Sequence, residues 1–270
     1  MPLFLGLILL GIGFIWKEKM IGAKIKISGW LVFSFFWATS PSYLYLSEGG
    51  DIFNASVCIV GVYILIYIAY HEWLSLQKNE YIPCLNWIAG GSFIAGIIYF
   101  TIDSGIIPEL KNLLINTVAE HSILLMNLFG AQATRHGSII IYGGAPITII
   151  FACTAIQSMV LFVGMNGSIN KVNVKRKILA ISATIIPIYF LNLIRNAAVV
   201  FLIGSNITSF NIAHNVIGKT GSLIALVGLL FLNFKITPEL YNEINCIIGL
   251  PKRNGPIEKF FRKIMGKKLK

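Results

Sequence analysis

Three residues on consecutive apolar segments have side chains that are suited to acyl transfer. Cys153 lies in FACTAIQSMVLF, Arg195 in NLIRN, and His214 at the start of HNVIGKTGS. A thiolate attacks a carbonyl carbon to form a thioester, and an imidazole moves the proton. A guanidinium stabilises the oxyanion of the tetrahedral intermediate. These types predict Cys153 as nucleophile, Arg195 for oxyanion stabilisation and His214 as general acid/base.

Polar residues accompany each member of this set at short spacing. Gln157 is four residues after Cys153 and Asn192 three before Arg195, so each shares a helix face with its partner. Asn196 and Asn215 adjoin Arg195 and His214, and Lys219 is five residues after His214. We expect supporting roles for all five. If His214 is not the base, Lys219 or His136 is the next base to test.

Each of the three residues also has a purely structural interpretation. A lone membrane cysteine is usually a small hydrophobe, and a histidine at a helix start often caps it. An arginine inside a span costs about 2.5–3.5 kcal/mol on insertion scales, which favours a functional role. Its structural alternative is an Arg195 that Asn192 and backbone carbonyls hold. Taken together, the three residues favour a catalytic role over the structural interpretation.

The composition indicates a polytopic membrane protein. The chain has 270 residues, of which 56% are hydrophobic and only 12% charged, and its net charge is +11. A soluble domain of this length carries roughly 25% charged residues. The basic residues lie at the ends of apolar runs and in the C-terminal tail, so we expect a membrane role and no nucleic-acid partner.

The four cysteines follow no metal or disulfide pattern. Cys58, Cys84, Cys153 and Cys246 include no CxxC pair, and no histidine pair has metal-ligand spacing. We therefore expect no zinc site, no cofactor and no disulfide framework. The first apolar run has no basic residue before its core and no cleavage site, so we do not expect it to be a cleaved signal peptide.

The predicted fold is an all-α integral membrane protein with about seven transmembrane helices. A span needs about 20 apolar residues, and seven segments approach or reach this length: 2–16, 27–46, 52–73, 84–107, 150–169, 178–203 and 214–234. Lysines and arginines gather in alternate connections and in the tail. The positive-inside rule then puts the N-terminus outside and the C-terminus inside.

This orientation brings the three reactive residues to one depth. Cys153 lies in the first turn of a segment that enters from outside, about 5 Å below the outer edge at 1.5 Å per residue. Arg195 precedes the outer end of the next segment, and His214 begins the last one. We expect a cell-membrane protein whose site faces the extracytoplasmic side.

An outer insert at 108–149 lies between the predicted spans four and five. Apolar residues from Leu110 to Leu128 recur at helical spacing, which indicates an amphipathic helix on the outer leaflet. The alternative makes 112–131 an eighth span, with Glu120 and His121 at its centre. SIIIYGGAPITII then predicts a small β-hairpin around a Gly-Gly turn.

We expect two regions overall. Residues 1–234 form the polytopic membrane domain, with a motif core at 151–222. Residues 235–270 form a basic amphipathic cytoplasmic tail, in which Phe260, Phe261, Ile264 and Met265 alternate with cations. Such a segment is expected to lie on anionic headgroups.

The motifs also resemble a known family. ACTAIQS, NLIRN and HNVIGKTGS, in this order and each near the outer end of a span, are similar to the exosortase/archaeosortase family. Ala155 departs from the glycine found in many relatives. The resemblance implies a membrane cysteine transpeptidase whose secreted protein substrates end in a short motif, a transmembrane helix and a basic cluster. It also implies transfer of the new C-terminus to a membrane lipid.

Two alternative functions remain open at this point. One is a cysteine protease at the membrane surface without a transfer step. The other is a transporter or lipid-binding membrane protein in which Arg195 and His214 hold an anionic headgroup. A binding protein tolerates Cys153→Ser, whereas a thioester enzyme does not.

Overall fold

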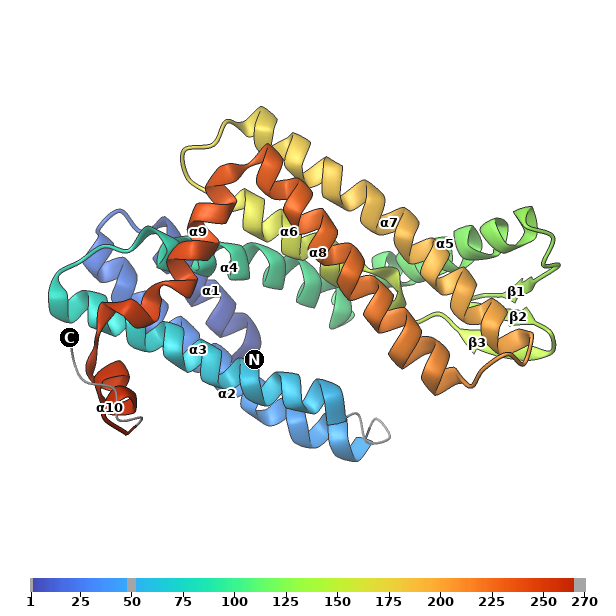
Figure 1. Ribbon diagram of the computed structural model, residues 1–270, viewed down its shortest axis with the longest axis horizontal. Coiled ribbons are helices and arrows are strands. Elements are labelled where there is room, and N and C mark those ends of the chain that lie inside the picture. Colours follow the sequence, from blue (N-terminus) through green and yellow to red (C-terminus); the bar gives the residue numbers. More distant parts are fainter. Residues whose placement is uncertain (1, 48–51, 265–270) are drawn as a thin grey trace. The chain divides into compact units, whose positions relative to one another are not determined.

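The computed structural model describes residues 2–47 and 52–264, which are mostly helical, and the chain forms two compact units (Figure 1). The first unit contains the chain up to Ile94, Gly167–Asn170 and the chain from Glu239. The second contains Ala95–Asn166 and Lys171–Pro238.

Within residues 2–47 and 52–264, five helices are long and apolar enough to cross a membrane. They are α2 (Lys19–Ser47), α3 (Ile52–Lys78), α4 (Pro83–Asp103), α7 (Val174–Gly204) and the continuous segment Asn211–Ile236. The predicted first and fifth spans are the shorter helices α1 (Pro2–Ile15) and α6 (Ile156–Gly167). Fourteen residues rise about 21 Å, less than a hydrocarbon core of about 30 Å. The all-α membrane fold is confirmed, whereas the number of spans and their orientation stay predictions.

In the first unit, α2 packs against both α1 and α3, and a buried ion pair joins two of these helices. Lys26 Nζ lies 2.8 Å from Glu72 Oε1 and donates a hydrogen bond to Asn86 Oδ1 on α4 at 3.2 Å. Both charged side chains are almost fully buried. A buried charge is tolerated only when it is paired, so this contact fixes the register of α2 against α3.

The C-terminal tail folds as α9 (Pro238–Ile248), the 3₁₀ turn η3 (Leu250–Arg253) and α10 (Pro256–Ile264). A disulfide joins Cys84, in the first turn of α4, to Cys246 in α9, with 6.0 Å between their Cα atoms. The expectation of no disulfide was therefore wrong. The two cysteines are 162 residues apart, so only the packing of the tail beside α4 brings them together.

The second unit combines helices with a small antiparallel sheet of β1 (Thr134–His136), β2 (Ile139–Tyr142) and β3 (Ala145–Thr148). Gly143 and Gly144 both have positive φ and link the paired residues Tyr142 and Ala145. Two positive-φ residues form the tight turn that suits the twist of a hairpin. The predicted hairpin is confirmed, with one additional strand.

Helix α5 (Pro108–Leu128) precedes the sheet, as the periodicity predicts. Its buried residues Val118, Ala119 and Met126 belong to a core with Ile140 of β2 and Val200 of α7. One face of α5 thus packs on the sheet and on α7. Its placement at the membrane surface stays a prediction.

The last elements of the second unit run together. Helix α7 lies along α8 (Lys219–Ile236), and the β2–β3 turn meets the end of α7 (Figure 1). A Cβ on Gly143 would overlap the carbonyl oxygen of Gly204. The close approach of these two glycines therefore fixes the sheet against the end of α7 that carries Arg195.

Candidate functional site

Cys153 lies in a short turn and not in a continuous helix. Phe151–Thr154 forms the 3₁₀ turn η1, and Ala155 follows in the left-handed region with φ of +59°. Thr154 Oγ1 donates to the carbonyl of Phe151 at 2.7 Å. The predicted span at 150–169 is therefore interrupted, because an L-residue in the left-handed conformation ends one helix before α6 begins.

Two asparagines of α7 hold this turn. Asn192 Nδ2 donates to the carbonyl oxygen of Cys153 at 2.8 Å, and Asn196 Nδ2 donates to the same atom at 3.0 Å. All three residues are buried. The residues are one helical turn apart on α7, so both amides point at one carbonyl. Both asparagines thus contact the Cys153 backbone directly, and their supporting role in the chemistry stays a prediction.

The sheet positions the other end of η1. The N–H of Ile149 donates to the carbonyl of Ser138 at 2.8 Å, and the N–H of Cys153 donates to that of Ile150 at 2.8 Å. Ile149 and Cys153 share the buried core that α5, the sheet and α7 form. The cysteine therefore sits on a turn anchored by the hairpin on one side and by α7 on the other.

Arg195 lies against the segment that carries His214. A Cβ on Gly218 would stand 3.0 Å from Arg195 Nε, so a larger residue there would crowd the guanidinium. Arg195 lies close enough to Cys153 and to His214 for their charges to interact. Within residues 2–47 and 52–264, the buried Nε of Arg195 has no hydrogen-bond partner. An unpaired buried donor is costly unless a ligand or intermediate satisfies it.

His214 lies in a π-helix, Asn211–Gly218 (η2), which continues into α8. Its ring stacks on Phe210, with 5.1 Å between centroids and 7° between planes. The side chain is partly buried. A π-helix is rare and widens the turn, and no sequence pattern predicted it here.

The remaining predicted residues also belong to the second unit. Gln157 is exposed in α6, beyond the break at Ala155. Asn215 donates to Asn211 Oδ1 at 2.7 Å and is exposed. Lys219 is partly buried at the start of α8, and His136 is exposed in β1. Their roles stay predictions. No group of three potential metal ligands occurs among the described residues.

A cavity of about 260 Å³ opens beside this site. Apolar residues of α7 and α8 and of the turn before α6 line most of it, and Asn192 and Arg195 lie in its wall. Sequence reasoning also missed a contact between α5 and α7, where His121 Nδ1 lies 2.5 Å from the Tyr189 hydroxyl. No local signal pairs these two residues.

These features define a class: a helical multi-span membrane protein with a buried cysteine, a guanidinium with a free donor and a histidine in one unit. A profile of the transmembrane exosortase family (Exosortase_EpsH) matches residues 2–232. The chain therefore belongs to that family, and it is a membrane sorting transpeptidase of the cysteine type in the general sense. Archaeosortase A of Haloferax volcanii is 22% identical over 269 residues, with 86% of each chain covered. No solved structure matches the chain.

Proposed function

We propose that this protein cleaves a C-terminal sorting signal from secreted proteins through a thioester on Cys153 and transfers the new C-terminus to a membrane lipid. The observation that carries the proposal is the unpaired Nε of Arg195, on the same helix as the two asparagines that hold the Cys153 carbonyl. A fixed donor with no ground-state partner is suited to an oxyanion that forms only during reaction.

The reaction has two balanced steps. His214 takes the proton of the Cys153 thiol, and the sulfur attacks the peptide carbonyl to form a C–S bond. Collapse of the tetrahedral intermediate breaks the C–N bond, and His214 returns the proton to the leaving amine. The acceptor amine then attacks the thioester, forms an amide, and its proton passes through His214 back to the thiolate. Arg195 stabilises the oxyanion in both steps.

The substrate follows from family membership together with the site. Relatives are expected to act on proteins that end in a motif, a transmembrane helix and a basic cluster. The apolar cavity beside Arg195 accommodates an apolar part of the substrate or acceptor next to the thiol. The active site is expected to face the extracytoplasmic side.

The test is single-turnover cleavage of a reconstituted substrate, with hydroxylamine as trap. Hydroxylamine converts a thioester to a hydroxamate, which mass spectrometry detects on the new C-terminus. Cys153→Ala abolishes cleavage and trapping, while Cys58→Ala, which replaces the other free cysteine of the described residues, retains both. Arg195→Lys inserts normally and loses about 10²–10³ in rate, because a point charge lacks the guanidinium geometry.

Other outcomes decide between the alternatives. Release of a free C-terminal carboxylate in the presence of lipid amines identifies a protease without transfer. Full cleavage by Cys153→Ala contradicts the mechanism. Absence of any cleavage by the wild type, together with binding of anionic lipid that needs Arg195 and His214 but tolerates Cys153→Ser, identifies the binding protein.

A further inference from the structure

A groove on the surface of α3 has no role in the chemistry above. It has a volume of about 450 Å³ and lies within the first unit. Its lining is Val60, Tyr63, Ile64, Ile66, Tyr67, Tyr70 and, from α10, Ile257. Ligand pockets commonly have volumes of about 300–1,000 Å³. Because α3 is a candidate span and Val60, Tyr63 and Ile64 are exposed, we expect this groove to face the hydrocarbon of the bilayer.

The length of the groove corresponds to one leaflet. Val60 and Tyr70 are ten residues apart on α3, which is about 15 Å at 1.5 Å per residue. One leaflet contributes half of a hydrocarbon core of about 30 Å. The groove therefore extends over the depth that a single acyl chain occupies. Its Tyr70 end lies toward the basic side of α3, where Lys78 ends the helix.

Helix α10 closes that end and presents two kinds of surface. Ile257, Phe260, Phe261 and Ile264 are all exposed and recur at the i, i+3, i+4, i+7 spacing of one helix face. Its cations are Lys259, Arg262 and Lys263, and none forms an ion pair with a residue that the structure describes. A helix of this kind lies in the interface of an anionic membrane.

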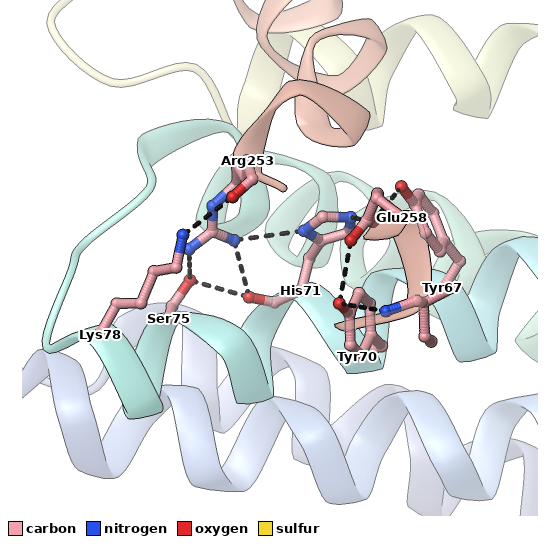
Figure 2. A network of polar contacts seen from close by, with 8 residues as sticks. Tyr67, Tyr70, His71, Ser75, Lys78, Arg253 and Glu258 are labelled. Carbon is pink, nitrogen blue, oxygen red and sulfur yellow. Dashed lines mark hydrogen bonds and ion pairs between the residues drawn. The ribbon is translucent and has the colours of Figure 1, made fainter. Parts of the chain in front are cut away.

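A polar network fixes α10 against α3 (Figure 2). Glu258 is buried, although its neighbours on α10 are exposed. Tyr67 donates to Glu258 Oε1 at 2.7 Å and Tyr70 to Oε2 at 2.9 Å, while His71 Nε2 lies 3.2 Å from Oε1. Two tyrosines that line the groove therefore also hold the helix.

The same network includes Arg253 in the turn before α10. Arg253 Nη1 donates to the carbonyl of His71 at 2.9 Å and lies 3.3 Å from its Nδ1. Its Nη2 donates to Ser75 Oγ at 3.1 Å (Figure 2). The same nitrogen donates to Glu80 Oε2 at 3.0 Å. Both terminal nitrogens of Arg253 and both carboxylate oxygens of Glu258 therefore have partners within the protein. The three cations of α10 are left for an external anion.

From the groove and the helix together, we infer a binding site for one anionic phospholipid of the leaflet on the basic side. An acyl chain fills the groove from Val60 to Tyr70. The phosphate lies at Lys259, Arg262 and Lys263. The aromatic stripe of α10 lies at headgroup level beside it. The inference is independent of the proposed catalytic function, since it uses no residue of the candidate active site.

Charge and shape together select this ligand. A zwitterionic lipid fills the groove equally well but neutralises fewer of the cations, and a soluble phosphate gains nothing from an apolar groove. Each cation near an anionic surface contributes about fivefold to binding. Loss of two cations is then expected to weaken binding by about 25-fold.

The experiment uses the full chain in zwitterionic detergent, titrated with phosphatidylglycerol or phosphatidylcholine and examined by native mass spectrometry. One phosphatidylglycerol is expected to remain bound, with phosphatidylcholine at least tenfold weaker. Lys259→Gln/Lys263→Gln is expected to reduce phosphatidylglycerol binding by about 25-fold. The matched control Lys17→Gln/Lys24→Gln, which removes two exposed cations elsewhere in the first unit, is expected to leave it unchanged.

A second variant tests the groove. Ile64→Trp fills an exposed lipid-facing position and is expected to displace the acyl chain at an unchanged unfolding temperature. Equal losses in the two charge variants would show bulk electrostatics only and overturn the site. Equal binding of phosphatidylglycerol and phosphatidylcholine would also overturn the site. So would displacement of the bound lipid by inorganic phosphate, or unchanged lipid binding in Ile64→Trp.

Discussion

Removal of the two asparagine amides at the Cys153 carbonyl gives the sharpest test of the site. Asn192 and Asn196 donate to one buried oxygen at 2.8 and 3.0 Å. In either single alanine variant the other bond remains, so the carbonyl is still satisfied. In the double variant it has no donor from α7. The two substitutions must therefore interact.

The expected magnitudes follow from that geometry. Each single variant loses one net hydrogen bond, about 0.5–1.5 kcal/mol. The double variant also leaves a buried carbonyl unsatisfied, which costs about 1–3 kcal/mol. Its loss should exceed the sum of the singles by about 1 kcal/mol or more. At about 2–4 °C per kcal/mol for a chain of this size, the excess is a few degrees in unfolding temperature.

The assay is thermal unfolding of the purified variants in one detergent, with single-turnover acylation measured in parallel. Asn215→Ala serves as control, because its bond to Asn211 is exposed and its loss should stay within about 0.5 kcal/mol. Acylation should slow most in the double variant, in which η1 is free to move. Additive singles, or a double variant no worse than either single, would refute the role of the shared carbonyl.

Three further predictions concern other elements. Ala155 has a φ of +59°, a conformation that a β-branched residue adopts only with strain and that glycine adopts freely. Ala155→Val should therefore lower the unfolding free energy by about 1–2 kcal/mol in thermal unfolding, while Ala155→Gly should not. Equal effects of the two substitutions would contradict the left-handed turn. Reduction of the Cys84–Cys246 disulfide, or its replacement by alanines, should lower the unfolding temperature. For a closed loop of 162 residues, the loss of unfolding free energy is at most about 5 kcal/mol. An unchanged unfolding temperature would show that the disulfide does not stabilise the fold. Burial by itself raises the pKa of Glu258, but hydrogen bonds from Tyr67 and Tyr70 outweigh it and the pKa is lowered. Its contribution is therefore present above the ordinary pKa of a glutamate and is lost as pH falls through the lowered value. The difference in unfolding temperature between wild type and Glu258→Gln should be constant near neutral pH and shrink below about pH 4.5, and a difference that grows in acid would reverse the sign of this reasoning.

The sequence by itself determined the class of fold and the local elements. Long apolar runs become helices because a helix satisfies its own backbone polar groups in an apolar environment. Five helices of the described residues are both long and apolar enough to span a membrane. The Gly143–Gly144 pair specified its turn because glycine, which has no Cβ, adopts positive φ without strain. The order of motifs around Cys153, Arg195 and His214 was sufficient to indicate the family that the profile match established.

Only the tertiary structure decided how the cysteine is held. The left-handed conformation of Ala155 runs against its intrinsic preference, and contacts of η1 with the sheet and with α7 impose it. The sequence indicated Asn192 and Asn196 only as polar residues near Arg195 on the same helix. Their common target, the carbonyl of Cys153, is set by the packing of η1 on α7, and no spacing along the chain encodes it.

Long-range pairing in the first unit was equally invisible in the sequence. Cys84 and Cys246 are 162 residues apart, and Glu258 meets Tyr67 across a separation of 191. The tail reads locally as a basic amphipathic segment, in which Glu258 is one acid among cations. Local periodicity reports the face that a helix presents, whereas the partner of that face depends on which distant helix the chain brings beside it.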